Sequence, residues 1–138
     1  MTDALLDAGP MVSLFDRGDP AHAHYRELVA ERSVVRRLLT TWPCITEASH
    51  LLADIERIEM LRWVGLGGVQ VFGFDQAAVL DMAPWMQAYT EGRRSRMDFA
   101  DASLLWLARE TDVRRIITLD VRDFSRYRLP DGRAFELL

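Results

Sequence analysis

Six carboxylates stand where acidic side chains from distant parts of the chain could meet. Each one follows a predicted strand or lies in the first turns of a predicted helix. The six residues are Asp7, Glu47, Asp98, Asp101, Asp120 and Asp123. Carboxylates in close proximity repel one another, so such a group is stable when protons or bound cations neutralise part of its charge. A bound metal ion is the simplest explanation for a group of this size.

The available ligands favour a hard divalent cation. The sequence contains one cysteine and three histidines, with no cysteine cluster and no paired histidines, so the ligands would be oxygen atoms. Oxygen ligands suit Mg²⁺ or Mn²⁺ and disfavour zinc. Mg²⁺ takes few carboxylates from a protein and leaves its other positions to water and phosphate. The expected chemistry is therefore phosphodiester hydrolysis by a metal-activated water.

Each acid also has a structural interpretation. Asp98 can cap a helix, and Glu47 can complement the dipole of its own helix. Asp7 and Asp120 follow apolar strands, where an acid costs desolvation energy unless it has a partner, so a functional role is favoured for both. Asp123 is predicted to be mainly structural.

Apolar patterns predict strands and helices in alternation. The predicted strands cover residues 4–8, 38–41, 69–72 and 115–119. The predicted helices cover residues 11–15, 20–32, 43–52, 55–64, 76–89 and 98–111. The four tryptophans are predicted to fill the core. This alternation implies an α/β fold in which a parallel sheet is covered by helices on both faces. Ligands of such sheets bind at the carboxyl ends of the strands, where the acids are expected.

Length and composition favour one domain in a reducing compartment. The 138 residues suffice for one hydrophobic core but not for two ordinary domains, so residues 1–138 are expected to form one domain. Cys44 has no internal disulfide partner, which favours the cytoplasm. The first ten residues carry two acids and no base, unlike a secretory signal, and no apolar run is long enough to span a bilayer. No membrane partner is expected.

The net charge of −4 by itself disfavours binding to nucleic acid. The distribution of the charges along the chain weakens this objection. Residues 93–138 contain ten arginines and eight acids, a balance of +2, whereas residues 1–92 contain seven arginines and thirteen acids, a balance of −6. A predicted loop over residues 91–96 carries Arg93, Arg94 and Arg96, which could contact phosphates. The acidity is therefore concentrated in the N-terminal part, and RNA stays a possible partner.

Three segments of the chain together resemble the PIN-domain family, and within it the VapC-type toxins of bacterial toxin-antitoxin pairs. In order, they are DAGPMVSLFDRGDPAHAHY, TTWPCITEASHLL and MDFADASLLWLARETDVRRIITLDVRDF. The last segment is the most specific, because it joins A-D-A-S-L at a helix start to T-L-D-x-x-D-F after the following strand. The resemblance spans nearly the whole chain.

This resemblance implies a PIN-like parallel sheet of about five strands and Mg²⁺- or Mn²⁺-dependent cleavage of RNA, often tRNA or rRNA. It also implies a homodimer and a cognate antitoxin protein that covers the active site. The implied metal-binding and catalytic residues are Asp7, Glu47, Asp101 and Asp120, with Asp98 and Asp123 as possible auxiliary acids.

One position departs from the family pattern, which commonly has Thr or Ser after the first aspartate. This chain has Ala8 there, and we expect activity with weaker metal affinity. Two alternative functions stay open: a catalytically silent PIN domain that binds RNA or a protein partner, and a PIN nuclease of RNA processing. An aspartyl-phosphate enzyme is disfavoured, because Gly9 stands where a haloacid-type phosphatase has its second aspartate and the chain lacks the lysine of receiver domains.

Overall fold

A parallel five-stranded sheet organises the molecule, in the order β3-β2-β1-β4-β5. The computed structural model describes residues 2–31, 34–91 and 96–138. The strands are β1 (Thr2–Leu6), β2 (Val35–Thr41), β3 (Gln70–Phe72), β4 (Arg115–Ile117) and β5 (Glu136–Leu137). The α/β class and the parallel sheet predicted from the sequence are confirmed.

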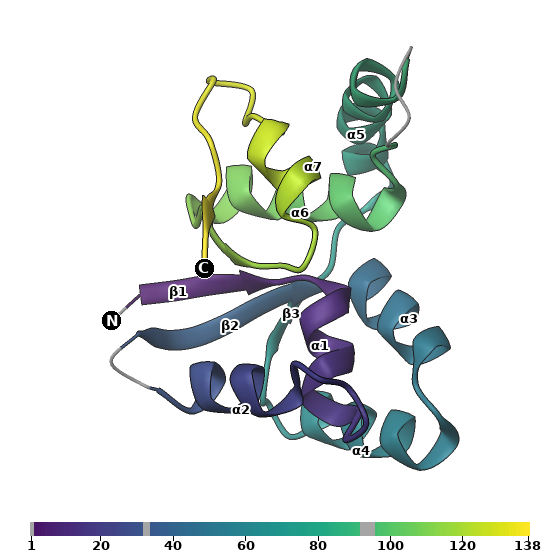
Figure 1. Ribbon diagram of the computed structural model, residues 1–138. Coiled ribbons are helices and arrows are strands. Elements are labelled where there is room, and N and C mark those ends of the chain that lie inside the picture. Colours follow the sequence, from purple (N-terminus) through teal and green to yellow (C-terminus); the bar gives the residue numbers. More distant parts are fainter. Residues whose placement is uncertain (1, 32–33, 92–95) are drawn as a thin grey trace.

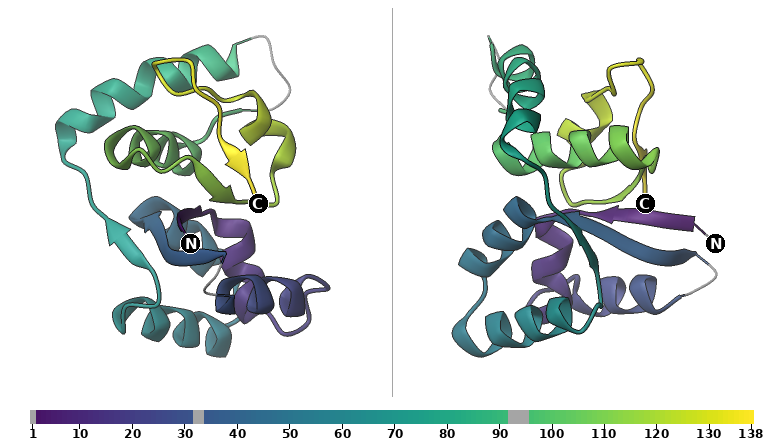
Figure 2. Two further views of the ribbon diagram at one scale, coloured as in Figure 1. Left: turned by 90° about the vertical axis from the view of Figure 1, so that its left-hand side faces the viewer. Right: turned by 180° about the vertical axis from the view of Figure 1, so that it is seen from behind.

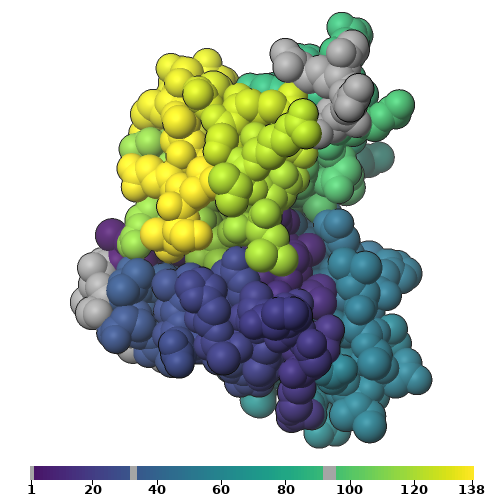
Figure 3. Space-filling model, viewed as in Figure 1, coloured from purple at the N-terminus to yellow at the C-terminus, as the bar shows by residue number. Residues whose placement is uncertain are grey.

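Helices cover both faces of this sheet (Figure 1). They are α1 (Ala8–Phe15), α2 (His22–Ala30), α3 (Trp42–Leu51), α4 (Asp54–Gly65), α5 (Gln76–Thr90), α6 (Phe99–Thr111) and α7 (Val121–Arg126). Helices α1 to α4 lie on one side and α5 to α7 on the other, with α5 packed along α6 at the outer side (Figure 2). The space-filling view shows the C-terminal segment on the upper side of the molecule and the N-terminal segment on the lower side (Figure 3).

The central strand β1 forms the middle of the core. Its residues Ala4, Leu5 and Leu6 have no exposed surface, which explains why this strand reads as a continuous apolar run. Leu5 pairs in register with Leu39 of β2 on one side and with Ile116 of β4 on the other. The ends of β1 and β4 therefore lie next to each other at the carboxyl edge.

Two helix starts differ from the prediction by two residues or more. Helix α1 begins at Ala8, which was predicted to belong to the preceding strand, rather than at residue 11. Helix α2 begins at His22 rather than at Pro20. Asp19 does not cap it, because its Oδ1 accepts from the Ala21 amide at 2.7 Å and its Oδ2 accepts from the Ser13 hydroxyl at 3.0 Å. These bonds stabilise a turn instead of a helix end.

Two elements were not predicted, namely α7 and β5. The six residues of α7 are too few for a helical period to show, and β5 has only two residues. The arginine-bearing part of the predicted loop at residues 91–96 lies mostly outside the described residues. Within the described residues, no helix is long and apolar enough to cross a membrane.

The prediction that all four tryptophans lie in the core is wrong for Trp42. Its side chain is 54% exposed, because Trp42 is the first residue of α3, at the carboxyl edge of the sheet. Trp63, Trp85 and Trp106 pack against the core as predicted.

Candidate metal centre

The carboxyl edge of the sheet brings the predicted acids together from four elements. Asp7 follows β1 and is the N-cap of α1, and its amide donates to the Ile117 carbonyl at the end of β4 (3.1 Å). Asp120 follows β4 and is the N-cap of α7. Asp101 lies in the first turn of α6. Residues separated by more than a hundred positions thus share one edge.

Three carboxylates form the tightest group. Asp101, Asp120 and Asp123 each offer one oxygen atom, and these atoms all lie within 4.8 Å of one another. Asp101 and Asp123 are each only 8% exposed, and Asp120 is half-buried. A single cation could contact all three. Asp123, predicted to be mainly structural, therefore lies inside the group.

Asp7 lies beside this group and is held by two hydrogen bonds. The Ala8 amide donates to its Oδ1 at 2.8 Å, and the Thr118 hydroxyl donates to its Oδ2 at 2.7 Å. Burial raises the pKa of Asp7, the two hydrogen bonds lower it, and the charges of Asp98 and Asp120 raise it further. Thr118 thus supplies a hydroxyl to Asp7 in a protein that has Ala8 after its first aspartate.

The surroundings of Asp101 also disfavour its ionisation. Burial, followed by the charges of Asp98 and Asp7, raises the pKa of Asp101 to about 8. The Tyr127 hydroxyl donates to its Oδ2 at 2.8 Å, which opposes part of that rise. Tyr127 has no exposed surface, so the orientation of this carboxylate is fixed by a core residue.

The last two acids of the tight group are linked through the start of α7. Asp120 Oδ1 accepts from the Asp123 amide at 3.1 Å, and Asp123 Oδ1 accepts from Arg126 Nε at 3.0 Å. Burial raises the pKa of Asp120. Thr118 contributes here as well, because its hydroxyl oxygen accepts from the Asp120 amide at 3.0 Å. One threonine therefore positions two of the acids.

Glu47 and Asp98 form the exposed rim of the site. Glu47 projects from α3, and partial burial followed by the charges of Asp98 and Asp7 raises its pKa. Asp98 caps α6 as predicted, since its Oδ1 accepts from the Asp101 amide at 2.8 Å. Asp98 therefore caps α6 and also lies close to the other acids.

These residues fit a hard divalent cation. The donors are carboxylate oxygens, and burial, followed by the charges of neighbouring acids, raises the pKa values of Asp7 and Asp101. A cation of charge +2 would favour the ionised carboxylates. Sequence reasoning missed the supporting residues Thr118 and Tyr127; only the T-x-D spacing before Asp120 pointed to the threonine.

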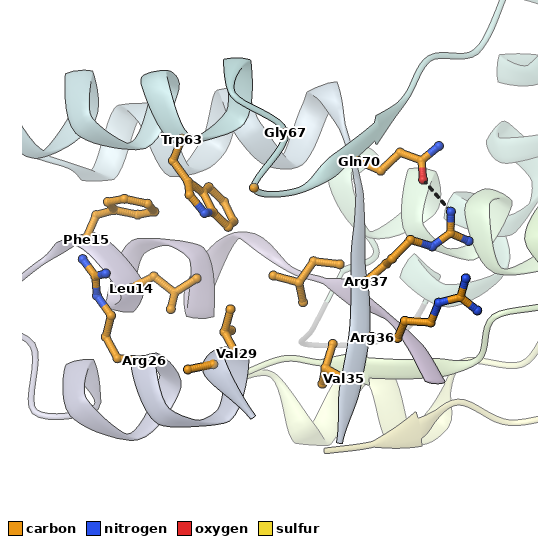
Figure 4. A pocket seen from close by; sticks show the side chains of 13 residues that line it. Leu14, Phe15, Arg26, Val29, Val35, Arg36, Arg37, Trp63, Gly67 and Gln70 are labelled. Atoms are coloured by element: carbon orange, nitrogen blue, oxygen red, sulfur yellow. Dashed lines mark hydrogen bonds between the residues drawn. The ribbon is translucent and has the colours of Figure 1, made fainter. Parts of the chain in front are cut away.

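A separate pocket of about 500 Å³ lies away from these acids, between α1, α2, α4 and the N-terminal half of β2 (Figure 4). Its walls combine apolar side chains such as Phe15 and Trp63 with Arg26, Arg36 and Arg37. Arg37 donates to the Gln70 side chain at 3.3 Å. None of the six acids lines this pocket, so it is distinct from the candidate metal centre.

Comparisons with known proteins give a structural match only. No family model and no curated protein matches the chain. Among solved structures, it is similar to VapC20 of Mycobacterium tuberculosis, described as a sarcin-ricin-loop-cleaving toxin, at a TM-score of 0.73 and 17% sequence identity. The match covers 87% of this chain and 92% of that one. The chain therefore has the PIN-like fold that its sequence predicts, shared with that toxin.

Proposed function

We propose that this protein is a divalent-metal-dependent endoribonuclease. The observation that carries the proposal is the convergence of Asp101, Asp120 and Asp123 at the carboxyl edge of a PIN-like sheet. Asp7 and Glu47 complete the proposed catalytic set, in which Asp7, Glu47, Asp101 and Asp120 hold the metal while Asp98 and Asp123 assist. The expected ion is Mg²⁺ or Mn²⁺.

A bound divalent cation would supply an activated water and neutralise charge on the scissile phosphate. The chain's own residues provide the geometry for that chemistry. Thr118 fixes the carboxylate of Asp7 through its hydroxyl, and Tyr127 fixes that of Asp101. Groups that orient ligands in this way hold a metal site in one arrangement and tune its affinity. The expected products carry 5′-phosphate and 3′-hydroxyl ends.

The proposal extends to a toxin role. The fold shared with VapC20 supports a toxin that cleaves tRNA or rRNA and pairs with a cognate antitoxin protein. A cytoplasmic location belongs to the same proposal, because Cys44 is a free thiol and RNA is the proposed substrate.

A homodimer is also proposed. Helix α4 exposes Ile55, Ile58 and Leu61, which are 72%, 52% and 43% exposed. Their three-residue spacing places them along one stripe of the helix. Exposed apolar stripes of this kind commonly mark a protein interface.

The decisive experiment incubates purified protein with total cellular RNA and Mg²⁺ and sequences the new 5′ ends. Cleavage should be discrete, and it should disappear with EDTA and in the double variant Asp7→Asn, Asp101→Asn. The control variant Asp54→Asn removes an exposed acid at the start of α4 and should cleave as the wild type does. A folded wild-type protein that cuts no RNA would point instead to a silent PIN domain that binds RNA or a protein. Cleavage confined to precursor RNA would favour a nuclease of RNA processing.

A further inference from the structure

We infer that an aromatic pocket beside the acids takes an unstacked nucleobase of single-stranded RNA. The pocket encloses about 590 Å³ and lies between the N-terminal ends of α3 and α6. This inference rests on the proposed ribonuclease function, because it assigns part of the same RNA to a second position.

Two exposed aromatic rings shape the pocket. Trp42, the first residue of α3, is 54% exposed, and Phe99, the first residue of α6, is 40% exposed. Both aromatic side chains therefore leave part of their ring surface open to solvent, where a ligand could stack on it. Unstacked bases of RNA are commonly bound by stacking on such rings.

The Phe99 ring is held in place by its neighbours. It packs edge-on against Phe74, with ring centroids 5.7 Å apart, and Phe74 packs in turn against Trp106 at 5.3 Å. Gly73 lies beside the Trp42 ring and has no side chain. A Cβ atom added at Gly73 would lie 4.0 Å from Trp42 Nε1. A ring fixed before binding loses little entropy when a base stacks on it.

The charge around the pocket selects a base over a phosphate. Glu47 and Asp98 both line it, and among the residues that the structure describes no arginine does. These carboxylates would repel a phosphate. A neutral base, in contrast, has N–H groups that can donate hydrogen bonds to the carboxylates. The remaining lining residues include His50 and Thr46, which offer further hydrogen-bonding groups.

The pocket is continuous with the candidate metal centre. Glu47 and Asp98 belong to its wall, and the Oδ1 atom of Asp98 accepts a hydrogen bond from the amide of Asp101 at 2.8 Å. A nucleotide whose phosphate lies at the metal centre would therefore have an adjacent base within reach of Trp42 and Phe99. The pocket would position the strand and contribute to the choice of cleavage site.

Binding measurements with defined probes test this inference apart from cleavage. The probes are a fluorescein-labelled oligoadenylate and the same ribose-phosphate backbone without bases, with Ca²⁺ replacing Mg²⁺ and with fluorescence anisotropy as the readout. Trp42→Ala should raise the Kd for oligoadenylate by roughly 5-fold to 100-fold, and Trp42→Phe should raise it less. Neither variant should change binding of the abasic backbone. Phe99→Leu should act in the same direction as Trp42→Ala.

A matched control separates this effect from general loss of apolar surface. Leu66→Ala removes a side chain that is 89% exposed at the end of α4, and it should leave both Kd values unchanged. Equal binding of oligoadenylate by wild type and Trp42→Ala, or no preference of the wild type for the probe with bases, would overturn the inference. Loss of binding to a protein partner in Trp42→Ala, with RNA binding unchanged, would likewise overturn it and assign the pocket to an apolar segment of that partner.

The two proposals fail in distinguishable ways. If the wild type cleaves cellular RNA while Trp42→Ala binds oligoadenylate normally, the base pocket is wrong and the nuclease stands. If binding of oligoadenylate depends on Trp42 while the wild type cuts no RNA, the nuclease is wrong and the base pocket stands.

Discussion

Replacing Asp101 by Asn should stabilise the metal-free protein at neutral pH, although Asp101 is one of the proposed metal ligands. The surroundings raise the pKa of this buried acid from 3.8 to about 8. The folded protein therefore binds more protons than the unfolded chain between those two values, and the unfolding free energy falls as pH rises through this range. Asn keeps the shape and the oxygen that accepts from Tyr127, and it carries no charge.

The magnitude follows from the size of the shift. Each pKa unit corresponds to about 1.4 kcal/mol, so ionisation of Asp101 costs the folded protein up to about 4 kcal/mol by pH 7. We expect this cost to be about 2–4 kcal/mol, since water that enters the site stabilises the ionised carboxylate. The difference in unfolding free energy between Asp101→Asn and wild type should grow by this amount from pH 4 to pH 7. Subtracting the two profiles cancels the titrating groups that lie far from Asp101.

Urea denaturation in EDTA at several pH values measures this difference. Asp54→Asn is the control, because it removes the charge of a highly exposed acid outside the candidate metal centre. Saturating Mg²⁺ should stabilise the wild type by about 2–3 kcal/mol at 100 times its Kd and should stabilise Asp101→Asn less. If the unfolding free energies of wild type and Asp101→Asn in EDTA changed in parallel with pH, the idea that the charge of Asp101 destabilises the metal-free protein would be refuted.

Three further predictions concern other parts of the molecule. Thr118→Val keeps the shape but removes the hydroxyl that donates to Asp7, so Mn²⁺ affinity measured by calorimetry should fall by roughly 10-fold to 100-fold; unchanged affinity would contradict the positioning role. Asp98→Ala should lower the unfolding free energy by about 1 kcal/mol, whereas Asp98→Ser keeps a capping oxygen and should recover most of it; equal losses would show that capping is not the cause. The double variant Ile55→Asp, Ile58→Asp should be monomeric by light scattering at a concentration where the wild type is dimeric, and a monomeric wild type would end the dimer proposal.

Much of the fold could be predicted because its signals are local. The apolar runs at β1 and β4 and the cap of α6 depend on neighbouring residues, and Asp98 forms this cap as the sequence predicts. The start of α2 was wrong by two residues because Asp19 is held by Ser13, six positions away. The short elements α7 and β5 are too brief to carry a period of their own.

The sequence by itself determined the type of the candidate site, because residue chemistry and position relative to the strands predict oxygen ligands at one sheet edge. Tertiary structure decided which oxygens are close, bringing Asp123 into the tight group with Asp101 and Asp120. It also decided that Thr118 and Tyr127 hold the acids, and that Trp42 faces solvent beside Glu47. The physical reason is that a periodic pattern reports which face of an element is buried, whereas contacts between side chains depend on how separate elements pack.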